Sequence, residues 1–165
     1  MTLVPGAATF DSTESFGMIR GGHVDVSILG ALQVSANGDL ANYMIPGKVF
    51  KGMGGAMDLI SNPEKTKIVV ATSHVAKDGS PKIVQKCSLP LTGANVVSTI
   101  ITDLVSRKSI IDLKTKLTKV QCVFQVDRAT GELTLTELAP GVEVEEVQSK
   151  TEAKFNIAET LEIME

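Results

Sequence analysis

Two stretches of the sequence decide the fold: residues 24–34 read VDVSILGALQV, and residues 67–73 read KIVVATS. Both are rich in β-branched residues, and the first is nearly apolar on both of the faces that a strand presents. Strands of a parallel sheet that is covered on both sides have this composition. The sequence therefore predicts an α/β domain in which a mixed, largely parallel sheet is flanked by helices.

Helix signals lie around these two strands. Asp11 and Glu14 have the spacing of a capping box, and they predict a short helix that runs through Ile19 and ends at a pair of glycines. A second short helix is expected over residues 56–60, directly after a glycine-rich turn. Residues 92–104 carry apolar side chains at helical spacing, so a third helix is expected there.

The C-terminal part of the chain has a different pattern. Alternating apolar and polar residues predict a β-hairpin over residues 120–136, followed by a short helix that carries Val144 and Val147 and by an acidic tail. Between 104 and 119, basic side chains surround apolar ones at helical spacing. A solvated helix or connector explains that pattern, and a basic amphipathic helix that binds a membrane or an acidic partner is the alternative.

The composition excludes several classes of function. The 165 residues form one domain with a net charge of −3, from 16 basic and 19 acidic side chains. Without a basic surface to displace counterions, no nucleic-acid partner is expected. No apolar run approaches the ~20 residues that cross a bilayer, so no membrane span is expected.

Cysteine and histidine are too sparse for metal chemistry. Cys87 and Cys122 lie far apart and form no CxxC pair, which indicates a reduced intracellular protein and no zinc site. His23 and His74 have no definite carboxylate partner, and each is expected to be a structural hydrogen-bonding group. No metal-binding residue is therefore predicted.

The glycine-rich turn is the most informative feature for function. Gly52, Gly54 and Gly55 precede a helix, so the backbone can approach a ligand closely and the first N–H groups of the helix are unpaired. Such donors suit an anion, or an oxygen that gains negative charge during a reaction. The GMGG spacing matches neither of the common nucleotide-binding loops. A plain tight turn is the alternative, and Asp58 is expected in the first turn of the helix.

Lysines flank this turn and the strand that follows it. Lys48 and Lys51 precede the glycines, and Lys77 follows the strand at residues 67–73. In an open α/β sheet, the loops at the carboxyl ends of the strands form the ligand crevice, so Lys77 is placed to reach a ligand there. A solvated surface lysine is the alternative for each of the three.

With these features in view, the chain resembles the β-subunit half of the family I coenzyme A transferases, and within them the 3-oxoacid CoA-transferases. The matching blocks extend over nearly the whole chain. They are SFGMIRGGHVDVSILGALQV from Ser15, GDLANYMIPGK from Gly38, KGMGGAMDL from Lys51, HVAKDGSPKIVQKCSLPLTG from His74 and APGVEVEEVQSKTEAKF from Ala139.

The resemblance implies an activity and a set of binding residues. Members of the family move CoA from an acyl-CoA such as succinyl-CoA to a 3-oxo acid such as acetoacetate through a glutamyl-CoA intermediate, in ketone-body metabolism. Coenzyme A is then a substrate, and no permanently bound cofactor is expected. By resemblance, Gly55 donates its N–H to the thioester oxygen beside Gly54, Lys51 lines the CoA site, and Lys77 contacts CoA.

The chain departs from the family pattern in two places. The nucleophilic glutamate belongs to an SENG motif upstream of the GAATF block, and this sequence contains no SENG, so no catalytic residue is assigned and the chain alone is expected to be inactive. Residues 104–121 stand where relatives pass almost directly from helix to strand, and they are interpreted as an atypical inserted segment of a partial CoA-transferase β domain that spans residues 1–165.

The same resemblance indicates partners and a compartment. An α half or a full-length subunit is expected to supply the glutamate, in a homo- or hetero-oligomer. The family predicts the mitochondrial matrix, although no transit peptide begins the sequence; the cytoplasm is the alternative. A truncated relative that binds CoA or a full-length subunit without catalysis is the alternative function.

Overall fold

Two sheets organise the protein, whose computed structural model describes residues 2–47, 52–103 and 122–164. The expected insertion at 104–121 lies outside the described residues. The larger sheet has six strands in the order β1 (Val26–Leu29), β4 (Lys67–Ser73), β6 (Thr99–Asp103), β7 (Cys122–Asp127), β8 (Glu132–Leu138) and β9 (Asn156–Ile163). The smaller sheet has the order β3 (Leu40–Ala41), β2 (Gln33–Ser35) and β5 (Ile83–Val84).

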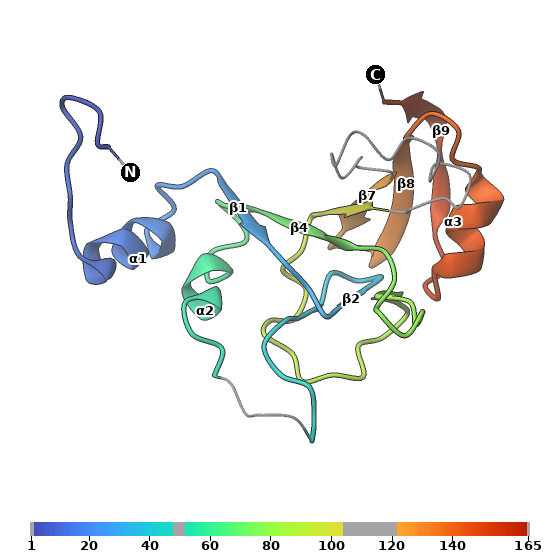
Figure 1. Ribbon diagram of the computed structural model, residues 1–165, viewed down its shortest axis with the longest axis horizontal. Helices are drawn as coiled ribbons and strands as arrows, with labels where there is room; N and C mark the ends of the chain where they lie inside the picture. Colours follow the sequence, from blue (N-terminus) through green and yellow to red (C-terminus); the bar gives the residue numbers. More distant parts are fainter. Residues whose placement is uncertain (1, 48–51, 104–121, 165) are drawn as a thin grey trace.

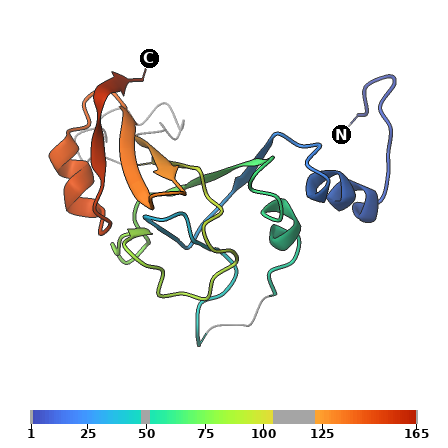
Figure 2. The same ribbon diagram turned by 180° about the vertical axis from the view of Figure 1, so that it is seen from behind.

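The pairing in the larger sheet is mixed, as predicted. Strands β1, β4 and β6 are parallel to one another, and β9 is parallel to β8. The hairpin of β7 and β8 supplies the antiparallel part of the sheet, and β7 also pairs antiparallel with β6. Helix α3 (Val144–Lys150) follows the hairpin, which confirms the predicted order of hairpin and short helix. It lies beside β8 and β9 (Figures 1 and 2).

The first helix forms where the capping box predicts it. Helix α1 (Ser12–Arg20) begins after Asp11, whose carboxylate accepts the N–H of Glu14 at 3.0 Å. It ends at Gly21, which donates its own N–H to the carbonyl of Gly17 at 2.9 Å. The helix and the N-terminal segment project from the end of the molecule opposite to α3 (Figure 1).

One apolar core joins the two sheets. Ile68 and Val70 of β4 pack in the same cluster as Val34 of β2 and Ile83 of β5. Phe124 of β7 is fully buried in it and meets the ring of Phe155 edge-on, with ring centres 5.3 Å apart. The small sheet is therefore a second layer against the large one, and the two sheets share one core.

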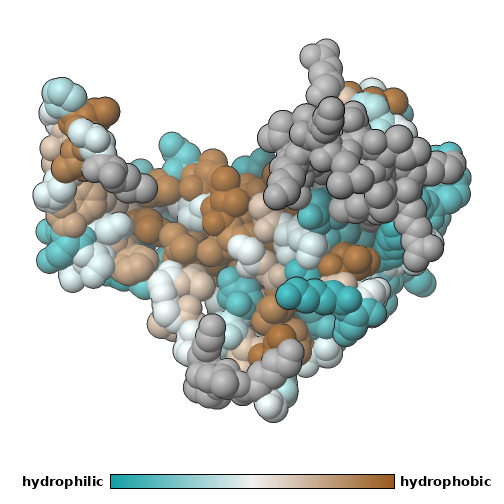
Figure 3. Space-filling view, in the orientation of Figure 1, coloured by the Kyte–Doolittle hydropathy of each residue, from teal (hydrophilic) through white to brown (hydrophobic). Residues whose placement is uncertain are grey.

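The stretch at residues 24–34 differs from its prediction. It is two strands in two different sheets, because the chain turns at 30–32 after β1 and enters β2. Strand β1 is the edge of the large sheet, and the side chains of Val26 and Ile28 are 47% and 68% exposed. Figure 3 shows apolar surface on this face. The buried-strand prediction was wrong because β-branched composition indicates a strand without saying what covers it.

A further prediction was wrong for a related reason. The helix expected at 92–104 is instead the inner strand β6, where Ile100 is fully buried and β-branched residues form the ladder between β4 and β7. A short apolar run cannot be assigned to helix or strand by periodicity alone. The acidic tail contains β9, an eight-residue edge strand held by its parallel pairing with β8.

Candidate functional site

Strand β4 separates the two groups of predicted site residues. Helix α2 (Ala56–Leu59), with the glycine-rich turn before it, leads into the amino end of β4, and the loop that carries Lys77 follows the carboxyl end (Figure 1). Seven residues of extended chain span roughly 20 Å. The structure therefore places Gly54 and Gly55 at one end of the strand and Lys77 at the other. Lys51 lies outside the described residues.

The glycine turn is built around contacts that other residues would disturb. Gly54 has a φ of +56°, in the left-handed region that glycine adopts without strain. A Cβ on Gly55 would lie 2.6 Å from Cζ of Phe16, because the ring of that α1 residue covers the turn. The predicted turn and short helix are thus confirmed, and Gly55 is the position where a side chain meets an obstacle.

The main-chain donors of this turn are only partly used. Ala56 N–H and Met57 N–H reach the carbonyls of Met53 and Gly54 over long distances of 3.4 Å each. Among the residues that the structure describes, the N–H of Gly55 has no hydrogen-bond partner. A half-buried donor of this kind is available to a carbonyl oxygen or an oxyanion.

The acidic residues near the turn have structural partners. Asp58 lies in the first turn of α2, as predicted, and forms an ion pair with Arg20 at the end of α1. Asp39, which lies apart from this turn directly before β3, accepts the main-chain N–H of Asn95 at 2.9 Å. Both carboxylates are thus engaged in structural contacts.

His74 is a buried structural group at the carboxyl end of β4, as expected. Its Nε2 lies 2.9 Å from Oγ1 of Thr151, and that hydroxyl donates its one proton to the carbonyl of Val147 at 2.8 Å. Nε2 must therefore carry the ring proton, and Nδ1 accepts from the hydroxyl of Thr102 at 2.8 Å. The Sγ of Cys122 continues this chain of hydrogen bonds, 2.9 Å from Oγ1 of Thr102.

This chain of hydrogen bonds links three elements. It joins β7 and β6 to the C-terminal end of α3 through the imidazole of His74. Burial, and secondarily the charge of Lys150, lowers the pKa of His74 from 6.5 to about 4, so the ring is neutral at pH 7. The role is structural, which agrees with the sequence prediction for this residue. His23, by contrast, lies nearer the surface beside Gly21.

A pocket of about 690 Å³ lies at the carboxyl end of β4. Lys77 lines it from the exposed loop, as the position after the strand predicts. Sequence reasoning missed Lys82, which lines the same pocket and precedes β5. An antiparallel bridge between Val75 and Pro81 folds the loop back and brings Lys82 close to Lys77. The pocket is lined by Leu32, Ile45, Ser73, Val75, Ala76, Lys77, Asp78 and Lys82.

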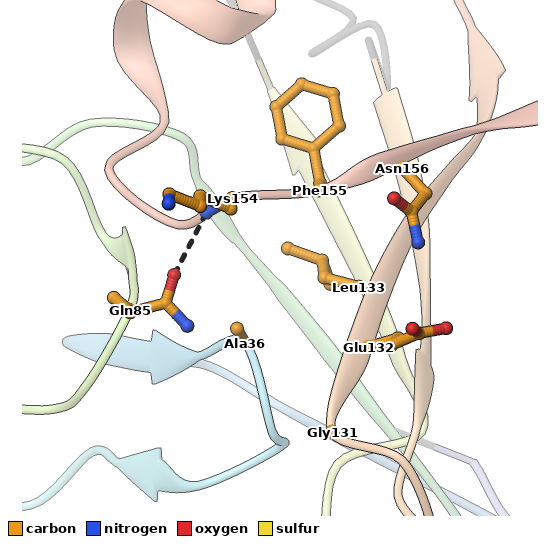
Figure 4. Close-up of a pocket in the computed structure, with 8 residues that line it drawn as sticks. All are labelled: Ala36, Gln85, Gly131, Glu132, Leu133, Lys154, Phe155 and Asn156. Carbon is orange, nitrogen blue, oxygen red and sulfur yellow. Dashed lines mark hydrogen bonds between the residues drawn. The ribbon is translucent and has the colours of Figure 1, made fainter.

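A second pocket, of about 430 Å³, lies between the two sheets (Figure 4). Glu132 and Asn156 stand on one side of it, and Gln85 accepts the main-chain N–H of Lys154 at 3.1 Å on the other. None of the predicted site residues lines it. Among the described residues there is also no group of three potential metal ligands, and no helix long and apolar enough to cross a membrane.

Comparison with known proteins connects this arrangement to a family. A model of the coenzyme A transferase family matches residues 1–150. The chain is 50% identical over 161 residues to a probable subunit of succinyl-CoA:3-ketoacid coenzyme A transferase from Bacillus subtilis (strain 168), with 98% of the chain and 65% of the relative covered. It is 46% identical to the mitochondrial succinyl-CoA:3-ketoacid coenzyme A transferase 2A of Rattus norvegicus, over 100% of the chain and 28% of that relative.

The fold agrees with these matches. The crystal structure of an acyl-CoA transferase apoenzyme from Escherichia coli O157:H7 superposes with a TM-score of 0.73 at 21% identity, over 98% of this chain and 32% of that one. The chain spans about two thirds of the length of the Bacillus subtilis relative and under a third of the length of the rat enzyme. A family match over residues 1–150 and the shared sheet architecture lead to one conclusion: the chain belongs to the coenzyme A transferase family.

Proposed function

We propose that this chain is the thioester-binding part of a CoA-transferase that moves CoA from succinyl-CoA to a 3-oxo acid such as acetoacetate, in ketone-body metabolism. The observation that carries the proposal is the N–H of Gly55, which has no partner among the described residues and lies in a turn where an added side chain would meet the Phe16 ring. The names of the Bacillus and rat relatives support the substrate pair.

The chemistry assigns this donor a definite task. A glutamate carboxylate attacks the thioester carbon, and the Gly55 N–H stabilises the tetrahedral oxyanion. Collapse breaks the carbon–sulfur bond and gives an acyl-glutamyl anhydride and the CoA thiolate. The thiolate attacks the glutamyl carbonyl, which releases succinate and leaves glutamyl-CoA. The carboxylate of acetoacetate then attacks this thioester, which forms a new anhydride and releases the CoA thiolate. The thiolate attacks the acetoacetyl carbonyl of the anhydride, which gives acetoacetyl-CoA and the free glutamate. Dividing the transfer in this way is covalent catalysis.

The glutamate must come from another polypeptide segment. The sequence contains no SENG motif, and Glu14 and Glu64 do not stand in a matching context. The Bacillus relative is named as one subunit of its enzyme, which supports a companion subunit in a homo- or hetero-oligomer. The rat relative is mitochondrial by name, which supports the mitochondrial matrix, with the cytoplasm as the alternative.

Complementation tests this proposal. The purified chain is combined with an α subunit and an N-terminal β segment that carries the glutamate, and acetoacetyl-CoA is measured after addition of succinyl-CoA and acetoacetate. We expect turnover in the complemented sample and none with the chain alone. A complemented sample that assembles without turnover contradicts the transferase assignment, and turnover by the chain alone contradicts the requirement for an external glutamate.

One observation favours a second function. The chain keeps Gly55 and Lys77 although it has no SENG glutamate, which suits a relative that binds CoA or a full-length subunit without catalysis. Calorimetric titration with CoA, with Lys77→Ala as the control, tests the first form, and capture by the full-length enzyme tests the second. Binding without turnover in the complemented sample would select this function over the first.

A further inference from the structure

Lys82 holds its ammonium group against two neutral acceptors beside the pocket at the carboxyl end of β4. Its Nζ donates to the carbonyl of Ala31 at 3.3 Å and to Oγ1 of Thr72 at 3.0 Å. The Thr72 hydroxyl in turn donates to the carbonyl of Ala31 at 3.0 Å, so it serves Lys82 as an acceptor. An ammonium has three N–H donors, so one of them has no partner among the described residues and can serve a further acceptor.

No ion pair balances the charge of Lys82 within the described part of the chain. Among those residues, no carboxylate oxygen lies within 4.0 Å of its Nζ. Asp103 is near enough to act on it through its charge, but that carboxylate accepts the main-chain N–H of His74 at 3.2 Å. Burial lowers the pKa of Lys82, and Asp103 opposes this change. Because a half-buried cation without a counterion is destabilised, an anion brought from outside stabilises it.

The pocket adds a second cation and apolar walls. Leu32, Ile45 and Val75 supply apolar surface, and Lys77 contributes a second ammonium from the loop after β4. The one acidic lining residue, Asp78, accepts from the main-chain N–H and the hydroxyl of Ser80 at 3.0 and 2.7 Å. The lining therefore carries a net positive charge, and it suits a molecule that has both an anionic group and an apolar part.

We propose that Lys82 and Lys77 together bind a phosphate group of coenzyme A in this pocket. The identity of the ligand rests on the proposed transferase function. A substrate carboxylate has the same charge, but it belongs near the thioester at Gly55, roughly 20 Å away at the other end of β4. Coenzyme A is elongated, with its thiol and its phosphates far apart, so it is the substrate that reaches both ends.

A purely structural role for Lys82 makes a different prediction. If Lys82 only tied Ala31 to Thr72, its loss would lower the stability of the protein and leave the affinity for anions unchanged. The proposal predicts a loss of affinity that depends on the phosphates of the ligand. Lys82→Gln keeps N–H donors for Ala31 and Thr72 without the charge, Lys82→Arg keeps the charge, and Lys86→Met removes an exposed lysine that does not line the pocket.

Calorimetry on the full chain separates these outcomes, with CoA, inorganic pyrophosphate, pantetheine and acetoacetate as probes. We expect Lys82→Gln to weaken CoA and pyrophosphate by about tenfold, which corresponds to about 1.4 kcal/mol. Lys82→Arg and Lys86→Met are expected to bind both like the wild type, and no variant should change the affinity for pantetheine. Equal affinities of Lys82→Gln and the wild type for pyrophosphate would overturn the proposal, as would a Lys82-dependent loss that appears only with acetoacetate.

A measurement on the wild type keeps the test independent of the folding of any variant. Lysine acylation by a water-soluble reagent, read by mass spectrometry, should slow at Lys82 and Lys77 when pyrophosphate is present and stay unchanged at Lys86. Absence of protection at Lys82 contradicts the phosphate site. If pyrophosphate protects Lys82 but the complemented sample shows no turnover, the transferase function fails while the site stands.

Discussion

The two ends of β4 offer a substrate different kinds of chemistry. At the amino end, the turn at Gly54 and Gly55 presents the main-chain N–H of Gly55. The ring of Phe16, from α1, lies against this turn. At the carboxyl end, Lys77 and Lys82 present charged side chains beside a pocket of about 690 Å³. The first end suits an oxygen whose charge grows during a reaction, and the second suits a group whose charge is permanent.

In the proposed function, the reacting part of the ligand and the part that anchors it lie at opposite ends of one strand. The carboxyl end is also the better anchored of the two, because His74 is buried there and bonded on both ring nitrogens. The glycine turn at the amino end is covered by α1, which packs on α2, and Met18 and Met57 of these two helices are exposed. Predictions on stability and activity test this contrast.

The largest effect is expected at the carboxyl end, on lowering the pH. The unfolded chain takes up a proton at His74 near pH 6.5, but the folded protein resists protonation until about pH 4. The contribution of His74 is thus complete above pH 6.5 and is lost as the pH falls toward 4. A shift of this size corresponds to about 3 kcal/mol, measured as the free energy of unfolding in urea.

The variant His74→Gln separates this effect from the titration of carboxylates. It is destabilised at pH 7, and its disadvantage relative to the wild type should shrink as the pH approaches 4. A constant difference between the two proteins from pH 7 to pH 4 would mean that the buried imidazole does not control acid stability, and the contrast between the two ends would weaken.

A smaller effect is expected at the amino end from Gly55→Ala. The new methyl group meets the Phe16 ring, so we expect a loss of about 1–2 kcal/mol in the free energy of unfolding, as for other overpacked sites. Because the N–H moves with the turn, turnover of the complemented enzyme should fall by roughly tenfold or more.

Two variants control this experiment. Gly52→Ala places a methyl group in open space three residues earlier and should leave both stability and turnover unchanged. Adding Phe16→Leu to Gly55→Ala should restore part of the lost stability, since it removes the obstacle. Full turnover in Gly55→Ala despite the shift of the ring would argue against an oxyanion contact at this N–H.

The smallest effect is expected from the ion pair of Arg20 with Asp58, which joins α1 to α2. The Arg20 side chain is 49% exposed, and exposed pairs contribute less than about 1 kcal/mol. Thermal unfolding of Arg20→Gln should show a slight loss at low salt that disappears at high salt. A loss larger than that of Gly55→Ala would show that this pair, rather than the packing of Phe16, holds the amino end together.

Local signals were sufficient for the elements whose cause is local. The cap of α1 needs only Asp11 and Glu14, and the hairpin of β7 and β8 needs alternation and a turn, so the sequence predicts both. Strand β4 appears where KIVVATS predicts it. The partners of a strand depend on distant segments, and for that reason the exposed edge at β1 and the inner strand β6 were not predictable from composition.

The residues of the candidate site also differ in whether local sequence signals were enough to predict them. Gly55 and Lys77 could be named because a turn and a strand end are visible in the sequence. Lys82 could not, because its contacts depend on how the loop after β4 folds back on Thr72 and on Ala31, which lies 51 residues earlier in the chain. The family resemblance supplied the chemistry of the first two and assigned no role to Lys82, although this residue lies within a matching block.

The hydrogen bonds that end at Cys122 have a practical consequence. Its Sγ is fully buried against Thr102, and burial raises the pKa of the thiol to about 11, so alkylating reagents meet almost no thiolate in the native protein. Labelling of Cys122 must then wait until β6, β7 and α3 part from one another. The labelling rate of Cys122 therefore reports how often this part of the domain opens.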